Sequence, residues 1–247
     1  MPLDGVFPLS QSLDHAGPLA RSVEDAALAL AVLAGMPAEL PKISLAGLRL
    51  GLVARHFNST EITPGVRACL DEALARFRAA GANLIELEIP RVSDANMALG
   101  TILRPEASLI HAQLMRLNST GYAPQTLAQL QAGRSIPAVD YLAALAARDA
   151  IRLSVERQFD TVAGLISPSV PFIAPFTDPV IEEGEDGEML SSGLANLTGH
   201  PAISLPIGLC DDLPVGLQLT GPLGRDDRLL VVAGALELAL GWDTNAY

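Results

Sequence analysis

The sequence of 247 residues contains one lysine, Lys42, two cysteines, Cys69 and Cys210, and only 4% aromatic residues. Two cysteines without metal-type spacing do not make the disulfide framework of a small secreted domain, so we expect free, buried thiols in a reducing compartment. No apolar run approaches the roughly 18 residues of a membrane span, and no basic segment followed by an apolar stretch suggests a signal peptide. These absences favour a cytoplasmic protein.

Positive charge is also scarce, because 16 Lys and Arg stand against 28 Asp and Glu, which gives a formal net charge of −12. The excess of negative charge argues against nucleic acids and anionic membranes as partners. The four histidines have neither metal-ligand nor triad spacing, and no G-x-S-x-G segment is present. The histidines are His15, His56, His111 and His200. We therefore expect no metal and no cofactor.

Hydrophobic periodicity predicts an α/β fold with a mixed sheet covered by helices. Short apolar or alternating runs predict five strands, at residues 48–53, 84–89, 161–166, 202–205 and 215–220. Apolar residues at helical spacing predict helices near 23–34, 64–80, 189–198 and 226–240. Because a strand, a helix and a strand follow one another over 48–89, we expect a βαβ unit there, with a polar loop at 54–62.

The first and second helices carry recognisable start signals. Ser22 stands where an N-cap is expected, and Thr63 followed by Pro64 supplies an N-cap and a proline at the first helical position. In the first helix, Leu30 and Leu33 belong to the predicted inner stripe, which Gly35 should end.

Residues 94–160 are helical in pattern almost throughout, with breaks predicted at 104–105, 121–124 and 133–137. We interpret this region as a helical excursion that lies against one side of the sheet, not as a separate domain. The acidic run 182–188 could be imagined as a cation site, but it lacks the alternating ligands of a calcium loop. A solvated loop is the preferred interpretation.

Two parts of the chain carry a family resemblance. Residues 12–25 follow the pattern S-x-D-x-x-G-P-x-x-R-x-V-x-D. Residues 196–206 follow N-x-x-G-x-P-A-x-S-x-P, and residues 213–222 follow L-P-x-G-x-Q-x-x-G-P. In this order the segments resemble those of amidase-signature hydrolases. The resemblance implies that residues 1–247 are the C-terminal portion of a single amidase-signature domain, truncated before its catalytic block.

The resemblance also implies a reaction, the hydrolysis of a carboxamide C–N bond by a Ser–cis-Ser–Lys arrangement. In the family these residues precede the segment matched by 12–25. Lys42 instead lies in a connector between the first helix and the first strand. The pair Ser191-Ser192 resembles the missing serine block only superficially. No catalytic residue can be placed, so we expect the chain alone to be inactive. The alternative is a noncatalytic short paralogue that serves in binding or assembly.

Substrate contacts are implied at two places. The family's helical layer shapes the substrate pocket, which makes Glu106 and Tyr122 candidate contacts, with His111 and Tyr141 as further polar side chains there. Surface or satisfied core positions are the alternative for each of these four.

The second place is the helix expected at 189–198, where Ser192 and Asn196 are candidate contacts; a structural cap of the helix end is an equal alternative for Asn196. Transamidosome subunits carry an acidic residue where this chain has Met189, and many members have threonine where it has Ser192. These departures favour a small amide as the substrate, and a homodimer is left open.

Overall fold

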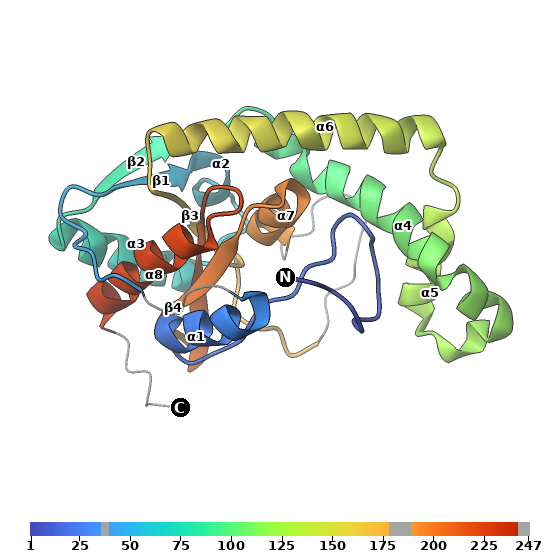
Figure 1. Cartoon of the computed structure of the whole chain (residues 1–247), viewed down its shortest axis with the longest axis horizontal. Helices are drawn as coiled ribbons and strands as arrows, with labels where there is room; N and C mark the ends of the chain where they lie inside the picture. The colour runs from blue at the N-terminus through green and yellow to red at the C-terminus, as the bar shows by residue number, and fades with distance from the viewer. Residues whose placement is uncertain (36–39, 178–188, 242–247) are drawn as a thin grey trace.

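The computed structural model describes residues 1–35, 40–177 and 189–241, except for the side chain of Leu190. Its centre is a five-stranded mixed sheet with the order β2-β1-β3-β5-β4 (Figure 1). The strands are β1 (Arg49–Val53), β2 (Asn83–Leu87), β3 (Gly164–Pro168), β4 (Ala202–Cys210) and β5 (Leu213–Thr220). All five predicted strands are therefore present. Strand β1 runs parallel to β2 and β3, whereas β5 is antiparallel to both β3 and β4.

One face of the sheet is covered by α1 (Val23–Ala34), α3 (Pro64–Ala79) and α8 (Asp226–Leu240). The helix α3 connects the parallel strands β1 and β2, which confirms the predicted βαβ unit. Side chains alternate along β1, so Leu50 packs into the core of this face and Val53 into the core of the other. The sheet is thus buried on both sides, as its apolar strands require.

The opposite face is covered by α4 (Ala95–Leu117), α6 (Ala138–Glu156) and α7 (Met189–Thr198). The excursion also contains α5 (Pro124–Gly133), and Figure 1 shows α4, α5 and α6 extending beyond the sheet to one side of the molecule. The core of this face joins Ile102 of α4 and Ile151 of α6 to Leu165 of β3. The predicted breaks near 121–124 and 133–137 are confirmed.

The break predicted at 104–105 was wrong, because Pro105 lies inside the continuous helix α4. Proline removes one backbone donor and usually kinks or ends a helix. Here the turns on both sides are fixed by burial, since Ile102 and Ala107 are 0% and 5% exposed. Tertiary packing therefore outweighs the local penalty of this proline.

Several smaller expectations also changed. The segment expected as a polar loop begins with a short helix, α2 (Ala54–Phe57), in which His56 is buried. In α1, Leu33 is 52% exposed and Ala31 is buried in its place. Both cysteines are free, as predicted, but they are half-buried rather than buried. The acidic run 182–188 lies outside the described residues.

Local signals at element ends agree with the structure. The Ser22 side chain accepts a hydrogen bond from the Asp25 backbone N–H at 3.1 Å, and Gly35 ends α1 in the left-handed conformation. Pro64 begins α3, although the Thr63 side chain makes no capping bond. The turn between β4 and β5 places Asp211 and Asp212 at φ 51° and 62°, as a two-residue hairpin turn with right-handed twist requires.

Within the described part of the chain, no helix is long and apolar enough to cross a membrane.

Candidate functional site

A cavity of about 610 Å³ lies where the two family-like parts of the sequence meet. Its walls come from residues 12–18, from α1, from residues 192–196 of α7, from the passage between α7 and β4, and from β5 and α8. Ser192 and Asn196 both line it, one helical turn apart on α7, whereas Glu106 and Tyr122 do not. The fold therefore brings residues separated by nearly the whole chain to one hollow.

Asn196 connects α7 to the loop that forms the facing wall. Its Nδ2 donates to the backbone oxygen of Leu13 at 3.1 Å and lies 3.1 Å from Nδ1 of His15. Nδ1 of His15 also lies 3.1 Å from the same Leu13 oxygen, so the amide, the ring and the carbonyl form one polar cluster. Asn196 is thus both a lining residue and a tie between the two walls, so its expected structural role is tertiary rather than a cap of its own helix.

The loop of residues 9–14 is folded around the carboxylate of Asp14. The two carboxylate oxygens of Asp14 accept the backbone N–H groups of Leu9 at 2.8 Å and Ser10 at 3.0 Å. A carboxylate that accepts backbone donors in this way stabilises a tight turn. The aspartate of the S-x-D segment is therefore a structural residue of the cavity wall.

Behind this loop, Glu106 of α4 receives four hydrogen bonds. The donors are the hydroxyls of Ser10, Ser12 and Tyr141 and the backbone N–H of Ser12, at 2.6 to 2.9 Å. Burial raises the pKa of Glu106, but the bonds from these donors together outweigh burial and hold the pKa below its usual range. The carboxylate is therefore ionised at neutral pH and attached to the loop.

The polar floor of the cavity is built on β5. The Gln218 Nε2 donates to the backbone oxygen of Ser191 at 3.2 Å and to the Thr220 hydroxyl at 3.3 Å. Ser204 of β4 pairs in register with Gln218 and lines the same cavity. Among the described residues, the buried Ser191 hydroxyl has no hydrogen-bond partner. The floor thus offers amide and hydroxyl groups, and the described lining residues include no lysine or arginine, although His15, His200, Asp14 and Asp226 border the cavity.

His200 fixes the passage from α7 into β4. Its ring nitrogens lie 2.8 Å from the Thr198 hydroxyl and 2.9 Å from a carboxylate oxygen of Glu156, which also accepts the Leu223 N–H at 3.2 Å. Burial lowers the pKa of His200, and Glu156 opposes that effect. Gly199 takes φ 74°, so it makes the sharp turn expected after α7.

The remaining predicted residues lie away from the cavity. The Tyr122 hydroxyl is 2.8 Å from Nδ1 of His111, and the Phe7 ring packs against the same histidine. Lys42 is exposed in the connector before β1 and does not line the cavity. The described residues contain no group of three or more histidine, cysteine or acidic side chains placed to hold a metal.

Sequence reasoning missed one buried polar pair. Nδ1 of His56 lies 2.9 Å from the hydroxyl of Ser167 on β3, and both residues are buried. Neither borders the cavity. Only the parallel pairing of β1 and β3, which brings the end of β1 beside Ser167, could have identified this pair.

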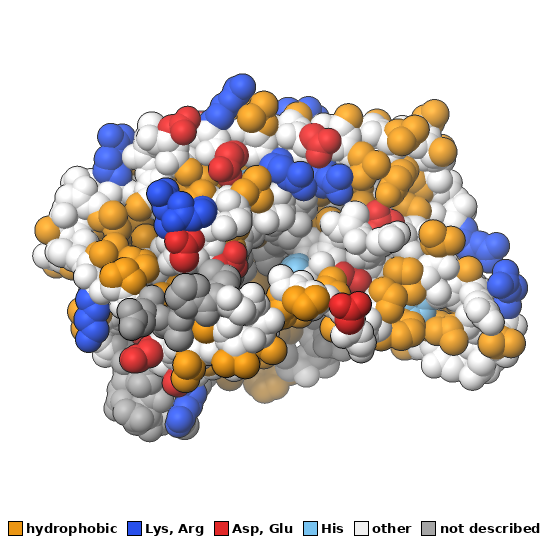
Figure 2. Space-filling model, in the orientation of Figure 1, with side chains coloured by type: hydrophobic (Ala, Val, Ile, Leu, Met, Phe, Trp, Pro, Cys, Tyr) orange, Lys and Arg blue, Asp and Glu red, His pale blue; other side chains and the backbone are white. Residues whose placement is uncertain are grey.

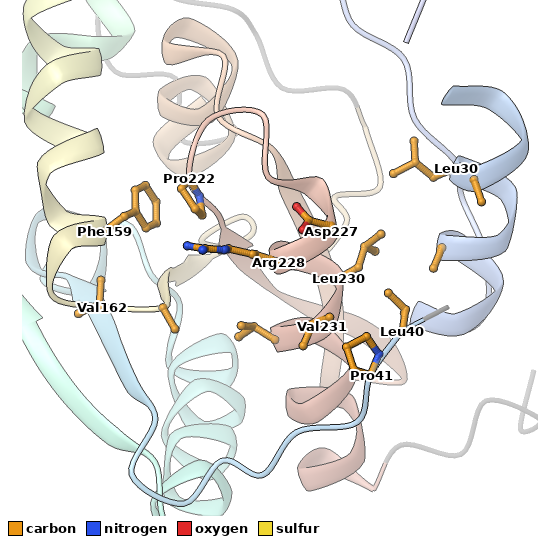
Figure 3. Close-up of a pocket in the computed structure, with 14 residues that line it drawn as sticks. Leu30, Leu40, Pro41, Phe159, Val162, Pro222, Asp227, Arg228, Leu230 and Val231 are labelled. Atoms are coloured by element: carbon orange, nitrogen blue, oxygen red, sulfur yellow. The ribbon is translucent and has the colours of Figure 1, made fainter. Parts of the chain in front are cut away.

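A second cavity, of about 520 Å³, lies between α1, α8 and the short helix η3 (Arg157–Asp160). Figure 3 shows mostly apolar side chains around it, with Arg228 extending across it toward Phe159 and Pro222. Asp227 at its border is paired with Arg225, whose hydrogen bonds hold the Asp227 pKa at about 2. None of the four predicted site residues lines this cavity.

A family model described as Amidase matches residues 1–230. The chain belongs to the amidase family. It is 31% identical, over 97% of its length, to a 2-amino-5-chloromuconic acid deaminase of Comamonas testosteroni, and 30% identical, over 96%, to an amidase of Pseudomonas putida. It covers 54% and 56% of those two proteins. It is also 32% identical to one of the subunits of the glutamyl-tRNA(Gln) amidotransferase of Salinispora tropica, over 96% of this chain and 57% of that protein.

Solved amidase structures share the fold of this chain. A crystal structure of an amidase aligns with a TM-score of 0.83 and 32% identity, over 94% of this chain and 54% of the other. A protein from a vestigial complex related to an s-triazine catabolic enzyme aligns with a TM-score of 0.79 and 25% identity, over 96% and 56%. This amidase-family chain thus spans about half the length of the relatives that it matches.

Proposed function

We propose that this chain is part of an amidase-signature hydrolase that cleaves the C–N bond of a small, linear carboxamide. The observation that carries the proposal is the cavity of about 610 Å³, which residues 12–18, Ser192 and Asn196 line together. Amide and hydroxyl groups, with no lysine or arginine among the described lining residues, suit a neutral amide. The comparison with an amidase supports this substrate class, and a cytoplasmic location belongs to the same proposal.

The proposal assigns the reaction itself to groups beyond this sequence. A serine would attack the carbonyl, a second serine in a cis peptide would relay its proton, and an unprotonated lysine would be the base. Lys42 does not suit that role, because it is exposed and outside the cavity. Ser192 and Asn196 would contact the substrate from one wall, whereas direct contact by Glu106 and Tyr122 stays a prediction.

The purified chain should therefore release no ammonia or amine above background from small carboxamides or aryl amides. Turnover that persists after Ser191→Ala and Ser192→Ala but disappears in Lys42→Ala would contradict this assignment. Turnover that disappears in Ser191→Ala would instead place the nucleophile on α7.

A noncatalytic short paralogue, serving in binding or assembly, is the second candidate. Several large apolar side chains are exposed on α1 and the segment before it, including Phe7 at 64%, Leu19 at 103% and Val32 at 79%. Figure 2 shows hydrophobic side chains gathered over α1 and over the α4–α5 end of the molecule. Such surface suits a protein partner as well as the rest of an amidase domain.

Reading the coding DNA in frame upstream of Met1 separates the two candidates. An open frame with a lysine-bearing strand and a glycine- and serine-rich block would support the hydrolase. An immediate stop codon with an independent promoter would support the noncatalytic paralogue.

A further inference from the structure

We propose that Glu106 is a positioning residue, whose carboxylate holds the loop of residues 9–14 in place as a wall of the candidate cavity and releases the loop when it becomes protonated. The inference rests on the proposed function only in taking this cavity as the substrate site. The contact itself joins α4, α6 and the loop of residues 9–14, all of which belong to this chain.

Both oxygens of the carboxylate are fully used. One accepts the hydroxyls of Ser12 and Tyr141, each at 2.7 Å, and the other accepts the Ser10 hydroxyl at 2.6 Å and the Ser12 N–H at 2.9 Å. Hydroxyl–carboxylate distances this short are typical of bonds to an ionised group. A direct contact with substrate would require one of these four bonds to be given up, so Glu106 acts on the cavity through the loop.

Hydrogen bonds to Glu106 attach the exposed part of the loop, while Leu13 packs into the core of this face of the sheet. Ser10 and Leu13 are buried, but Ser12 is exposed, and its hydroxyl and N–H both donate to Glu106. Among the hydrogen bonds of the described residues, the other tie from this loop to a distant part of the chain is the bond from Asn196 to the Leu13 oxygen, because the Asp14 bonds stay within the loop. Since Ser12, Leu13 and Asp14 line the cavity, loss of the Glu106 bonds would loosen one wall and leave α7 in place.

The groups around Glu106 determine the direction in which its pKa is shifted. Burial raises its pKa, and the bonds from Ser10, Ser12 and Tyr141 lower it by more. From α6, Tyr141 faces the carboxylate, which raises the pKa of the phenol, while Arg148 acts on Tyr141 in the opposite sense. From the loop, Asp14 is the nearby acidic side chain, with its carboxylate on Leu9 and Ser10.

The sign follows from the lowered pKa. A carboxylate whose pKa is lowered by folding stabilises the folded loop at any pH above the ordinary carboxyl pKa of about 4.3. That stabilisation is lost as the pH falls through the lowered pKa of the folded state. Protonation would also place a hydrogen where a donor already points, so at least one of the four bonds would be lost.

Amide hydrogen exchange measured by NMR on the full chain tests the inference. In Glu106→Gln the protection factor of the Ser12 amide should fall at least tenfold at pH 6, because the new NH2 group must face a donor. Core amides, such as that of Leu50, should keep their protection. The matched control is Glu72→Gln on α3, an exposed glutamate paired with Arg76, which should leave Ser12 unchanged.

The pH dependence separates positioning from a general structural role. In the wild-type chain the Ser12 protection should fall on acidification, and Glu106→Gln should show no such step. Tyr141→Phe removes one bond to the ionised form, so it should move the step to higher pH by at least half a unit, and it tests the inference even if Glu106→Gln fails to fold.

Unchanged Ser12 protection in Glu106→Gln, or an equal loss at core amides, would overturn the inference, as would an unmoved step in Tyr141→Phe. No substrate is used, so such a failure leaves the proposed hydrolase intact. Amidase turnover by the chain alone would refute the assignment of the reacting groups to residues outside this sequence, and it would leave the inference about the loop unaffected.

Discussion

At the scale of single residues, His56 is a buried imidazole whose pKa is strongly lowered. It is 2% exposed, and its Nδ1 lies 2.9 Å from the Ser167 hydroxyl. Burial, with a smaller effect from the charge of Arg55, lowers the pKa of His56 to about 4. The ring is therefore neutral at physiological pH and serves as a hydrogen-bonded core residue.

His56 should make the protein less stable in acid. Its pKa is lowered in the folded state, so its contribution is complete above an unfolded pKa of about 6.5 and is lost as the pH falls toward 4. A difference of this size corresponds to about 3 kcal/mol. We expect the free energy of unfolding, measured by urea denaturation at pH 7 and pH 4.5, to fall less in His56→Gln than in the wild type. Ser167→Ala, which keeps the buried ring, should retain the wild-type loss, and a flat response there would contradict this prediction.

At the scale of elements, α4 supports both the helical layer and the loop beside the cavity. It touches α5 where Gly133 meets the helix, and the Ser108 hydroxyl donates there to the Leu130 oxygen. A Cβ on Gly133 would collide with the Arg104 oxygen and with the Ser108 hydroxyl. The absence of a side chain at this one position allows α4 and α5 to approach so closely.

Gly133→Ala should therefore destabilise the protein. Overpacking of a close helix crossing costs roughly 1–3 kcal/mol, more than the gain in helix propensity from alanine. Gly100→Ala on α4 is the matched control, because a Cβ there meets nothing within 4 Å. Urea midpoints at neutral pH should show a clear loss for Gly133→Ala and no loss for Gly100→Ala; equal midpoints would show that the crossing is looser than described.

The helix α7 offers a direct test of the cavity. In an active enzyme that contains this chain, Ser192→Leu should raise KM severalfold or change the preference among amides, because a larger side chain would enter the cavity. The melting temperature should change little, since Ser192 is exposed toward that space. Unchanged kinetics in Ser192→Leu would show that α7 does not line the substrate site. The control is Ser119→Leu, at an exposed position that does not line the cavity, which should leave the kinetics unchanged.

At the scale of the whole molecule, one border of the sheet stands out. Strand β4 is the longest described strand, lies at the end of the order β2-β1-β3-β5-β4, and carries Leu209 at 43% exposure. An edge strand with apolar exposure is a template for pairing with another chain. The net charge of −12 opposes association, so the balance should depend on salt.

Leu209→Lys should reduce concentration-dependent association at high salt, because a charge on an edge strand disfavours strand pairing. Light scattering over a concentration series would measure the effect. Leu238→Lys makes the same change of charge on α8, at a position 78% exposed, and should act less. Equal effects would mean that net charge, and not the β4 edge, controls association.

Much of the fold could be predicted because its signals are local. Alternation along a strand, helical spacing of apolar residues, the Ser22 cap and the Gly199 turn each depend on neighbours within a few residues, so five strands and the main helices were identifiable. The segments that carry the family resemblance are likewise contiguous runs of residues, and they led to the amidase family, which the family model confirms.

The tertiary structure alone decided which distant groups meet. Glu106 binds Ser12 across 94 positions, Asn196 binds the Leu13 oxygen across 183, and His56 meets Ser167 across 111. No periodicity selects such partners, because a hydrogen bond is specific only after packing has placed its donor and acceptor within about 3 Å. For the same reason Pro105 could remain inside α4, where burial on both sides outweighed a local signal to stop.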